Sequence, residues 1–242
     1  MSAKHHALIH AAHALRTELS PLRFSEPVTH VYNPLEYAAA SHEAYLKRYG
    51  SGQKKVVFLG MNPGPYGMTQ TGVPFGEIAS VRDWMGIDEP VGKPPHENVK
   101  RPVVGFDCPQ SEVSGRRLWG LFSQRYGAAE LFFKEHFVAN YCPLVFMEAG
   151  GKNRTPDKIA PQEMAPVYAA CDRHLRQVLE ALQPEWLIGV GAFAESRALL
   201  QQEFFPQLKI GRVLHPSPAS PAANKDWSGN VTRTLIKLGV WK

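Results

Sequence analysis

Four short apolar runs constrain the fold of this chain more than any other feature. Each is about five residues long and rich in Val, Ile, Leu or Phe, and together they cover residues 56–60, 137–141, 186–190 and 210–214. Runs that are apolar at almost every position are typical of strands buried on both faces of a parallel sheet. The sequence therefore predicts a small parallel sheet at the centre of the molecule.

Apolar residues at helical spacing flank and separate these runs. The periodic segments are residues 5–19, 35–49, 163–182 and 192–204. Strands that alternate with amphipathic helices favour an α/β fold, here a three-layer α/β/α sandwich with a central, mainly parallel four-stranded sheet. With 242 residues, 44% of them hydrophobic, the chain fits one domain of residues 1–242 whose first 50 or so residues are helical.

The carboxyl ends of the predicted strands indicate where a ligand would bind. In open α/β sheets the crevice lies beyond these ends, so the segments after Gly60, Tyr141 and Leu214 are expected to line one pocket. Residues 88–114 are rich in Pro and Gly and show little periodicity. They indicate a long ordered loop rather than a linker between domains.

Charge and cysteine content limit the partners and cofactors. The formal charge of +5 favours a polyanionic partner, although an ordinary basic enzyme carries a similar charge. Cys108, Cys142 and Cys171 are too few and too scattered for a disulfide framework or for a zinc or iron–sulfur site. We expect three core thiols in a reducing compartment and no metal.

The N-terminal residues have a mixed polar pattern, and no apolar stretch of about 18 residues occurs anywhere in the chain. Secretion and membrane insertion are therefore not expected. We expect a monomer in the cytoplasm, associated with the nucleoid in a bacterium, or in the nucleus of a eukaryote.

A segment dense in Pro and Gly follows the first apolar run. Its sequence is MNPGPYGMTQTGVPFGE, and it contains neither GxGxxG nor GxxxxGK[ST], so it is not a nucleotide fingerprint. Backbone N–H groups in such a stiff loop can point at a ligand oxygen. Asn62 either satisfies its own loop or binds a water, and Phe75 is either core or a stacking face for a base.

Two further polar residues lie at predicted strand ends. Asn140 in HFVANYCPL either fixes a neighbouring loop or binds a ligand through its amide. His215 begins HPSPASPAANKDW, where it either bonds a loop carbonyl or faces the pocket. The prolines after it predict a stiff loop, and stiffness is what a wedge needs to enter a base stack.

Taken together, the segments GMNPGPYGMTQTGVPFGE, NYCPL and HPSPASPAANKDW resemble the single-strand-selective monofunctional uracil-DNA glycosylases, a branch of the uracil-DNA glycosylase superfamily. The resemblance extends over about residues 37–242. It implies an enzyme that hydrolyses the N-glycosidic bond of uracil in single- and double-stranded DNA and so initiates base excision repair. It also implies that no metal and no organic cofactor takes part.

The resemblance assigns roles to three residues at the reacting bond. Asn62 would orient the attacking water, since a neutral amide is too weak a base to deprotonate it. His215 would donate a hydrogen bond to uracil O2, with help from a backbone N–H near Met61. Catalysis would then come mainly from stabilising uracil as it leaves as an anion.

Three other residues would bind the base. Asn140 matches the amide that accepts from uracil N3–H and donates to O4, a pattern that cytosine reverses. Phe75 matches the stacking aromatic. Gly64 would lie near C5, where a small residue leaves room for a substituent, so the resemblance suggests that 5-hydroxymethyluracil and related bases are tolerated.

The predicted wedge would contact DNA. Its residues are Pro218, Ala219, Ser220, Pro221, Asn224 and Lys225. The vertebrate pattern has Arg-Asn after the prolines and Gly before Trp, where this chain has Ala219, Ser220 and Asp226, so we expect weaker penetration of duplex DNA and weaker retention of the product. Tyr66 replaces a common Phe in the first motif, which we expect to matter little.

Other functions remain open at the level of sequence. A cousin that excises xanthine or hypoxanthine could use the same scaffold, and a non-catalytic module that binds damaged DNA could keep Phe75 and the wedge. The iron–sulfur branch of the superfamily is disfavoured because three cysteines cannot supply four ligands. Lyase activity is expected to be absent, because Lys225 is the only lysine within the motif segments.

Overall fold

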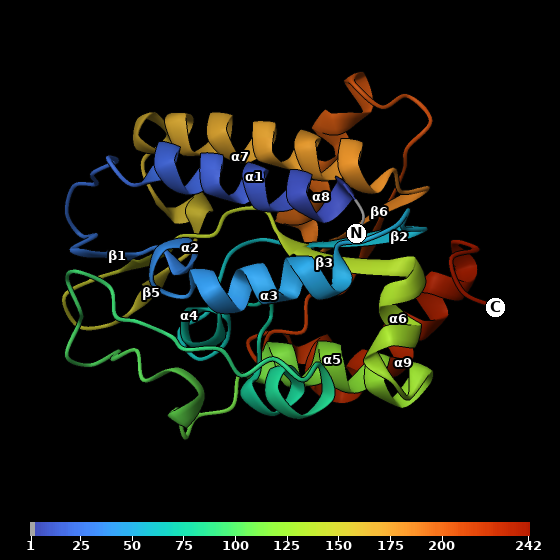
Figure 1. The fold of residues 1–242 in the computed structure, drawn as a ribbon, viewed down its shortest axis with the longest axis horizontal. Helices are drawn as coiled ribbons and strands as arrows, with labels where there is room; N and C mark the ends of the chain where they lie inside the picture. Colours follow the sequence, from blue (N-terminus) through green and yellow to red (C-terminus); the bar gives the residue numbers. More distant parts are fainter. Residues whose placement is uncertain (1–2) are drawn as a thin grey trace.

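The computed structural model describes residues 3–242 and has a central sheet of four parallel strands. These are β2 (Val56–Gly60), β3 (His136–Asn140), β6 (Trp186–Val190) and β7 (Lys209–Val213), in the order β3-β2-β6-β7 (Figure 1). All four predicted strands are present, and two of them begin one residue earlier than expected. The predicted sheet is therefore confirmed.

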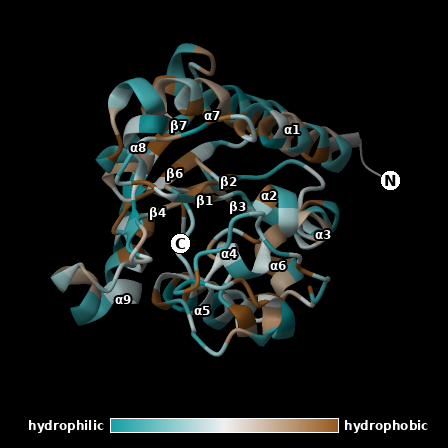
Figure 2. Cartoon of the chain, turned by 90° about the vertical axis from the view of Figure 1, so that its left-hand side faces the viewer, coloured by the Kyte–Doolittle hydropathy of each residue, from teal (hydrophilic) through white to brown (hydrophobic). Residues whose placement is uncertain are grey.

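Helices cover both faces of this sheet (Figure 1). One layer contains α1 (Ala3–Leu19), α7 (Pro161–Leu182) and α8 (Ala192–Leu199), and the other contains α5 (Val113–Tyr126), α6 (Ala129–Glu135) and α9 (Pro221–Lys237). Figure 2, turned by 90°, shows the strands between α1 and α7 on one side and α5 on the other. The three-layer α/β/α sandwich is confirmed.

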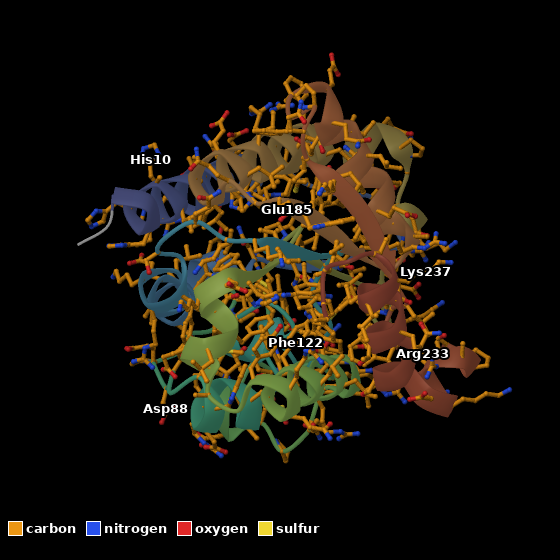
Figure 3. The ribbon with its side chains drawn as sticks, turned by 90° about the vertical axis from the view of Figure 1, so that its right-hand side faces the viewer. His10, Asp88, Phe122, Glu185, Arg233 and Lys237 are labelled. Atoms are coloured by element: carbon orange, nitrogen blue, oxygen red, sulfur yellow. The ribbon has the colours of Figure 1, made fainter. Side chains whose placement is uncertain are left out.

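Aromatic packing fixes α5 against the sheet. The rings of Phe122 on α5 and Phe132 on α6 stack with centroids 4.3 Å apart, and Phe122 lies 5.0 Å from Phe58 of β2. Phe122 is nearly inaccessible to solvent and lies inside the molecule in Figure 3. Buried aromatic side chains contribute much of the stability of such a core. The start of α5 is thereby held near the carboxyl edge of the sheet.

Two of the predicted helices are interrupted in the structure. The expected helix over residues 35–49 is divided into α2 (Pro34–Tyr37) and α3 (Ala39–Tyr49) at Ala38, whose φ and ψ of −113° and 26° are not helical. The chain at Gly72 packs closely on this break, where the side chain of His42 bonds the Gly72 carbonyl at 2.8 Å. The second segment changes from α8 to a 3₁₀ turn at Leu200–Glu203.

A second, antiparallel sheet was not predicted. It consists of β1 (His30–Tyr32), β4 (Val145–Met147) and β5 (Asn153–Arg154), in the order β1-β4-β5. Strands of two or three residues are too short to show a period of two in the sequence. The chain returns to this sheet at β4, shortly after β3, and β5 with the residue that follows it brings Asn153 and Thr155 beside the first motif.

The remaining elements are single turns. They are α4 (Met68–Thr71), the π-helical turn Ser80–Trp84, and the 3₁₀ turns Gly105–Asp107 and Pro156–Lys158. Residues 88–114 are largely irregular, as predicted, apart from one 3₁₀ turn and the start of α5 at Val113. Within residues 3–242, no helix is both long and apolar enough to cross a membrane.

Candidate active site

One cavity of about 220 Å³ lies at the carboxyl edge of the parallel sheet. All six residues predicted to bind or transform a base line it: Met61, Asn62, Gly64, Phe75, Asn140 and His215. Asn140 is the last residue of β3, and the others follow β2 and β7; the carboxyl ends of these strands meet at this edge. The expected shared pocket is therefore present, although the end of β3 itself, and not the segment just after Tyr141, lines it.

The amide of Asn62 is held by the neighbouring loop. Its Nδ2 donates to the carbonyl oxygen of Leu144 at 3.1 Å, and the backbone N–H of Cys142 donates to the Met61 carbonyl at 2.9 Å. With Nδ2 engaged, Oδ1 is the amide atom that can accept a hydrogen bond from a water. The geometry is compatible with the predicted water-orienting role.

The ring of His215 is a neutral donor. Its Nδ1 accepts a hydrogen bond from the backbone N–H of Ser217 at 3.1 Å, so the ring proton belongs on Nε2. Burial lowers the pKa of His215, which keeps the imidazole uncharged at neutral pH. A β-carbon on Gly191 would lie 3.1 Å from the His215 β-carbon, so any larger residue at this position would crowd the histidine side chain.

Phe75 is held in an unusual backbone conformation. Its φ of 53° lies in the left-handed region, which costs a non-glycine residue about 1–3 kcal/mol and persists only where the surroundings enforce it. Here the Phe75 carbonyl accepts from Trp119 Nε1 at 2.9 Å and from the Glu77 N–H at 2.7 Å. The ring centroid lies 6.4 Å from that of His215. Strain of this kind is characteristic of functional sites.

Asn140 and Phe75 meet over Gly60 at the end of β2. A β-carbon on Gly60 would overlap Asn140 Oδ1 and would lie 2.5 Å from Phe75 Cε2. Only glycine therefore allows the amide and the aromatic ring to approach the same strand end. The Asn140 Nδ2 donates to Met68 Sδ at 3.3 Å, a weak acceptor that a better one on a ligand can replace.

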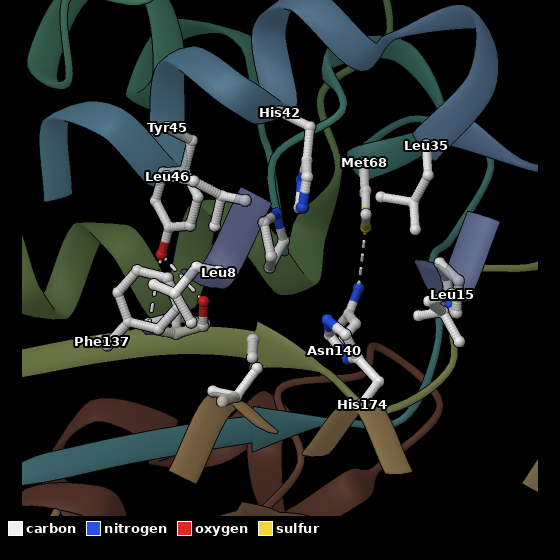
Figure 4. A pocket seen from close by; sticks show the side chains of 15 residues that line it. Leu8, Leu15, Leu35, His42, Tyr45, Leu46, Met68, Phe137, Asn140 and His174 are labelled. Atoms are coloured by element: carbon white, nitrogen blue, oxygen red, sulfur yellow. Dashed lines mark hydrogen bonds between the residues drawn. The ribbon is translucent and has the colours of Figure 1, made fainter. Parts of the chain in front are cut away.

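A small apolar cavity of about 30 Å³ lies behind Asn140. Figure 4 shows the bond between Met68 and Asn140 and the rings of His42 and His174 nearby. Burial lowers the pKa of both histidines, that of His174 to about 4, so the wall behind Asn140 is uncharged. An uncharged wall suits an amide that must bind a neutral base.

The predicted wedge is only partly a loop. Residues 215–220, hereafter the 215–220 loop, connect β7 to α9, and Pro218 and Ala219 are exposed at its tip. The helix α9 starts at Pro221, so Pro221, Asn224 and Lys225 lie in its first turns and not in an extended loop as predicted. The reason is the Ser220 side chain, which caps the helix by accepting from the Ala223 N–H at 3.3 Å.

Two of the departures from the family pattern, Asp226 and Tyr66, have structural partners. Asp226 breaks α9 with a φ of −162°, accepts from the Gly229 N–H at 2.8 Å, and pairs with Arg233 at 3.3 Å, so its charge is partly balanced. Figure 3 shows Arg233 and Lys237 on α9, whose start projects from the body of the molecule. The Tyr66 hydroxyl bonds Arg101, which a Phe could not do.

The cavity contains five polar residues that were not predicted from the sequence: Glu112, Ser114, Asn153, Thr155 and Ser217. Glu112 precedes α5 in a polar segment whose sequence carries no specific signal for a site. Its Oε2 is fully enclosed and has no hydrogen-bond partner among the described residues. Burial, and secondarily the charge of Glu77, raises the pKa of Glu112 to about 7.

We expect Glu112→Gln to stabilise the protein at pH 8 and to have a much smaller effect at pH 5. The raised pKa means that the folded state binds the proton more tightly than the unfolded state, so stability is lost as pH rises from about 4.5 to 7. The full effect is at most about 3 kcal/mol, since one pKa unit is worth about 1.4 kcal/mol. Thermal melts of both proteins at both pH values test this. Equal melting temperatures at pH 8 would contradict it.

Within the described part of the chain, no group of three His, Cys, Asp or Glu side chains could hold a metal ion. Cys108, Cys142 and Cys171 are free and buried. Lys225 does not line the cavity.

Comparison with known proteins defines the class. The model of the uracil DNA glycosylase superfamily matches residues 47–235. The chain is 47% identical over 227 residues to the single-strand selective monofunctional uracil DNA glycosylase of Bos taurus, with 93% of this chain and 84% of that protein covered. The Mus musculus protein of the same name is 46% identical, with 93% and 81% covered. The chain therefore belongs to the single-strand selective monofunctional family of the uracil DNA glycosylase superfamily.

A solved structure supports the fold independently. The crystal structure of Pedobacter heparinus SMUG2 matches with a TM-score of 0.66 and 18% sequence identity, covering 95% of this chain and 97% of that one. At this level of identity the likeness concerns the fold alone.

Proposed function

We propose that the protein removes uracil from DNA by hydrolysing the N-glycosidic bond of a flipped-out nucleotide. The observation that supports this most is the convergence of Asn62, His215, Asn140 and Phe75 on one cavity. The names of its relatives point to the same substrate.

Stabilisation of the leaving group would supply most of the catalysis. As the bond breaks, the sugar becomes positive and uracil becomes an anion, so a donor at O2 gains strength in the transition state. His215, neutral and with its proton on Nε2, is such a donor. A preorganised donor of this kind contributes about 3 to 4 kcal/mol. Asn62 Oδ1 would hold the water that attacks the sugar.

Recognition of the base would fall to Asn140 and Phe75. The amide accepts from N3–H and donates to O4, giving up its weak bond to Met68. Stacking on an aromatic ring is worth about 1–3 kcal/mol per base, similar to the few kcal/mol that flipping costs. Gly64 at the cavity wall leaves space for a substituent on the base, such as a 5-hydroxymethyl group.

We further propose that the protein acts as a monomer on single-stranded and duplex DNA, with the 215–220 loop and the start of α9 against the strand. The net charge of +5 favours this contact. Without an arginine at Ala219, we expect the enzyme to favour single strands, where no neighbouring pair has to be opened.

A panel of damaged bases tests this function. Oligonucleotides that carry uracil, xanthine or hypoxanthine, single-stranded and duplex, are incubated with excess enzyme and then treated with alkali. We expect strand breaks to form faster at uracil than at xanthine or hypoxanthine. Breaks at a purine only would support a cousin with another specificity, and tight binding without breaks would support a recognition module.

Gly60→Ala is expected to lower the single-turnover rate on uracil by about 10²-fold, the loss typical of a misplacement of about 1 Å. The added methyl would displace either the Asn140 amide or the Phe75 ring. The rate is measured together with the melting temperature.

Gly120→Ala is the matched control. Gly120 lies on α5, and a β-carbon there would meet nothing within 4 Å. This variant should cleave like wild type. A Gly60→Ala enzyme of undiminished rate would show that the contact between Asn140, Phe75 and Gly60 is not needed.

A further inference from the structure

One side chain on α5 holds the 215–220 loop. Arg117 Nη1 donates to the Pro216 carbonyl at 3.0 Å and, more weakly, to the Ser217 carbonyl at 3.4 Å, and its Nη2 donates to Asn224 Oδ1 at 2.8 Å. The guanidinium thus contacts the loop beside His215 and the first turns of α9 at the same time. Its forked geometry allows bonds in two directions from one rigid plane.

The contact at Asn224 continues to the tip of the loop. Asn224 Nδ2 donates to the Pro218 carbonyl at 2.8 Å, so Arg117, Asn224 and Pro218 form a chain of hydrogen bonds. Pro218 is exposed at the tip and has no side-chain donor of its own. Besides the bonds within the loop from the Ala219 N–H to Ser217 Oγ and from the Ser220 N–H to the Ser217 carbonyl, the tip is thus held by a side chain from another element.

The contact at Pro216 continues to the ring of His215. Pro216 follows His215 directly, and the next residue, Ser217, supplies the N–H that fixes the imidazole through Nδ1 at 3.1 Å. The helix that carries Arg117 also carries Trp119, which bonds the Phe75 carbonyl at 2.9 Å. The same helix thus fixes the stacking residue on one side of the cavity and the loop of His215 on the other.

We propose that Arg117 is a positioning residue that stiffens the 215–220 loop, so that its tip can enter the base stack of duplex DNA. This inference rests on the proposed function. Unstacking and flipping a nucleotide in duplex DNA costs a few kcal/mol, and a flexible loop cannot hold the bases apart against that cost. In a single strand the cost is much smaller. Loss of Arg117 should therefore harm cleavage of duplex DNA more than cleavage of single strands.

The alternative is that Arg117 binds a phosphate directly. The two roles differ in what Arg117→Lys does, because lysine keeps the charge but cannot form the fork. They also differ in salt dependence, since loss of one phosphate contact lowers the slope of log binding against log salt by about 1.

The test measures single-turnover rates of wild type, Arg117→Ala and Arg117→Lys on uracil in single strands and in duplex. We expect the ratio of duplex rate to single-strand rate to fall about tenfold or more in both variants, with an unchanged salt slope for binding. The melting temperature of each variant shows whether it is folded.

Arg116→Ala is the matched control. Arg116 is exposed on the same helix, and its Nη1 donates to Ser111 Oγ at 3.2 Å. Removing this charge should leave the ratio as in wild type. Recovery of the duplex rate in Arg117→Lys, or an equal loss on both substrates in Arg117→Ala, would overturn the positioning role. If the wild-type protein does not remove uracil from single-stranded DNA, the proposed function itself is overturned.

Discussion

His215→Ala is expected to release uracil about 10² to 10³ times more slowly than wild type under single-turnover conditions. The neutral imidazole, fixed by the Ser217 N–H, is the donor that the cavity offers to the developing charge on O2. Alanine removes that donor without filling the space, so binding of the oligonucleotide should change little. The measurement is the rate constant at saturating enzyme together with the dissociation constant.

A matched control is His10→Ala, a change at an exposed position of α1 that does not line the cavity (Figure 3). That variant should cleave at the wild-type rate. A His215→Ala rate within about threefold of wild type would remove the histidine from the mechanism, because a factor of three is below 1 kcal/mol.

The same mechanism predicts the effect of pH. Because burial lowers the pKa of His215, less than half of the rings are protonated at pH 6.5, where an ordinary histidine would be half protonated. The wild-type rate on uracil should therefore fall by less than half between pH 8 and 6.5. A decline of half or more over this interval would mean that the pKa of the active ring is not lowered.

Asn140→Asp is expected to reduce the preference for uracil over cytosine by about 10³-fold or more. A site built around buried polar partners rejects the wrong hydrogen-bonding pattern by roughly 10⁴ to 10⁵. The carboxylate keeps the shape of the amide but loses the donor for O4, and its charge opposes the uracil anion. The wall behind it is uncharged, so nothing there compensates.

Rates on uracil and cytosine in the same single-stranded sequence give this preference. Asn140→Ala serves as the comparison, since it removes the amide without adding charge. If Asn140→Asp kept the wild-type preference, the amide would not be the group that distinguishes the two bases.

The sequence was sufficient to predict the elements that bury apolar runs. The four parallel strands and the helices α1 and α7 carry strong periods, so their positions were correct to within about two residues. The six cavity residues predicted at strand ends also came together, because parallel strands present their carboxyl ends at one edge.

The features that could not be predicted depend mainly on contacts between segments that are distant in the sequence. The strands β4 and β5 are too short to show a period, so Asn153 and Thr155 gave no signal. The roles of Glu112 and Arg117 arise from where α5 packs, which its own residues do not encode. The helix at Pro221 begins inside a segment that looked like a proline-rich loop, because a proline in the first turn does not oppose a helix.

The most direct test of the proposed function measures free uracil. A single-stranded oligonucleotide with one uracil is incubated with wild-type protein in EDTA, and the released base and the alkali-labile sites are counted, with borohydride present in a parallel sample. We predict one free uracil for each abasic site, formed without metal, and no covalent adduct. Intact DNA under these conditions, or an adduct trapped by borohydride, would contradict a monofunctional hydrolase.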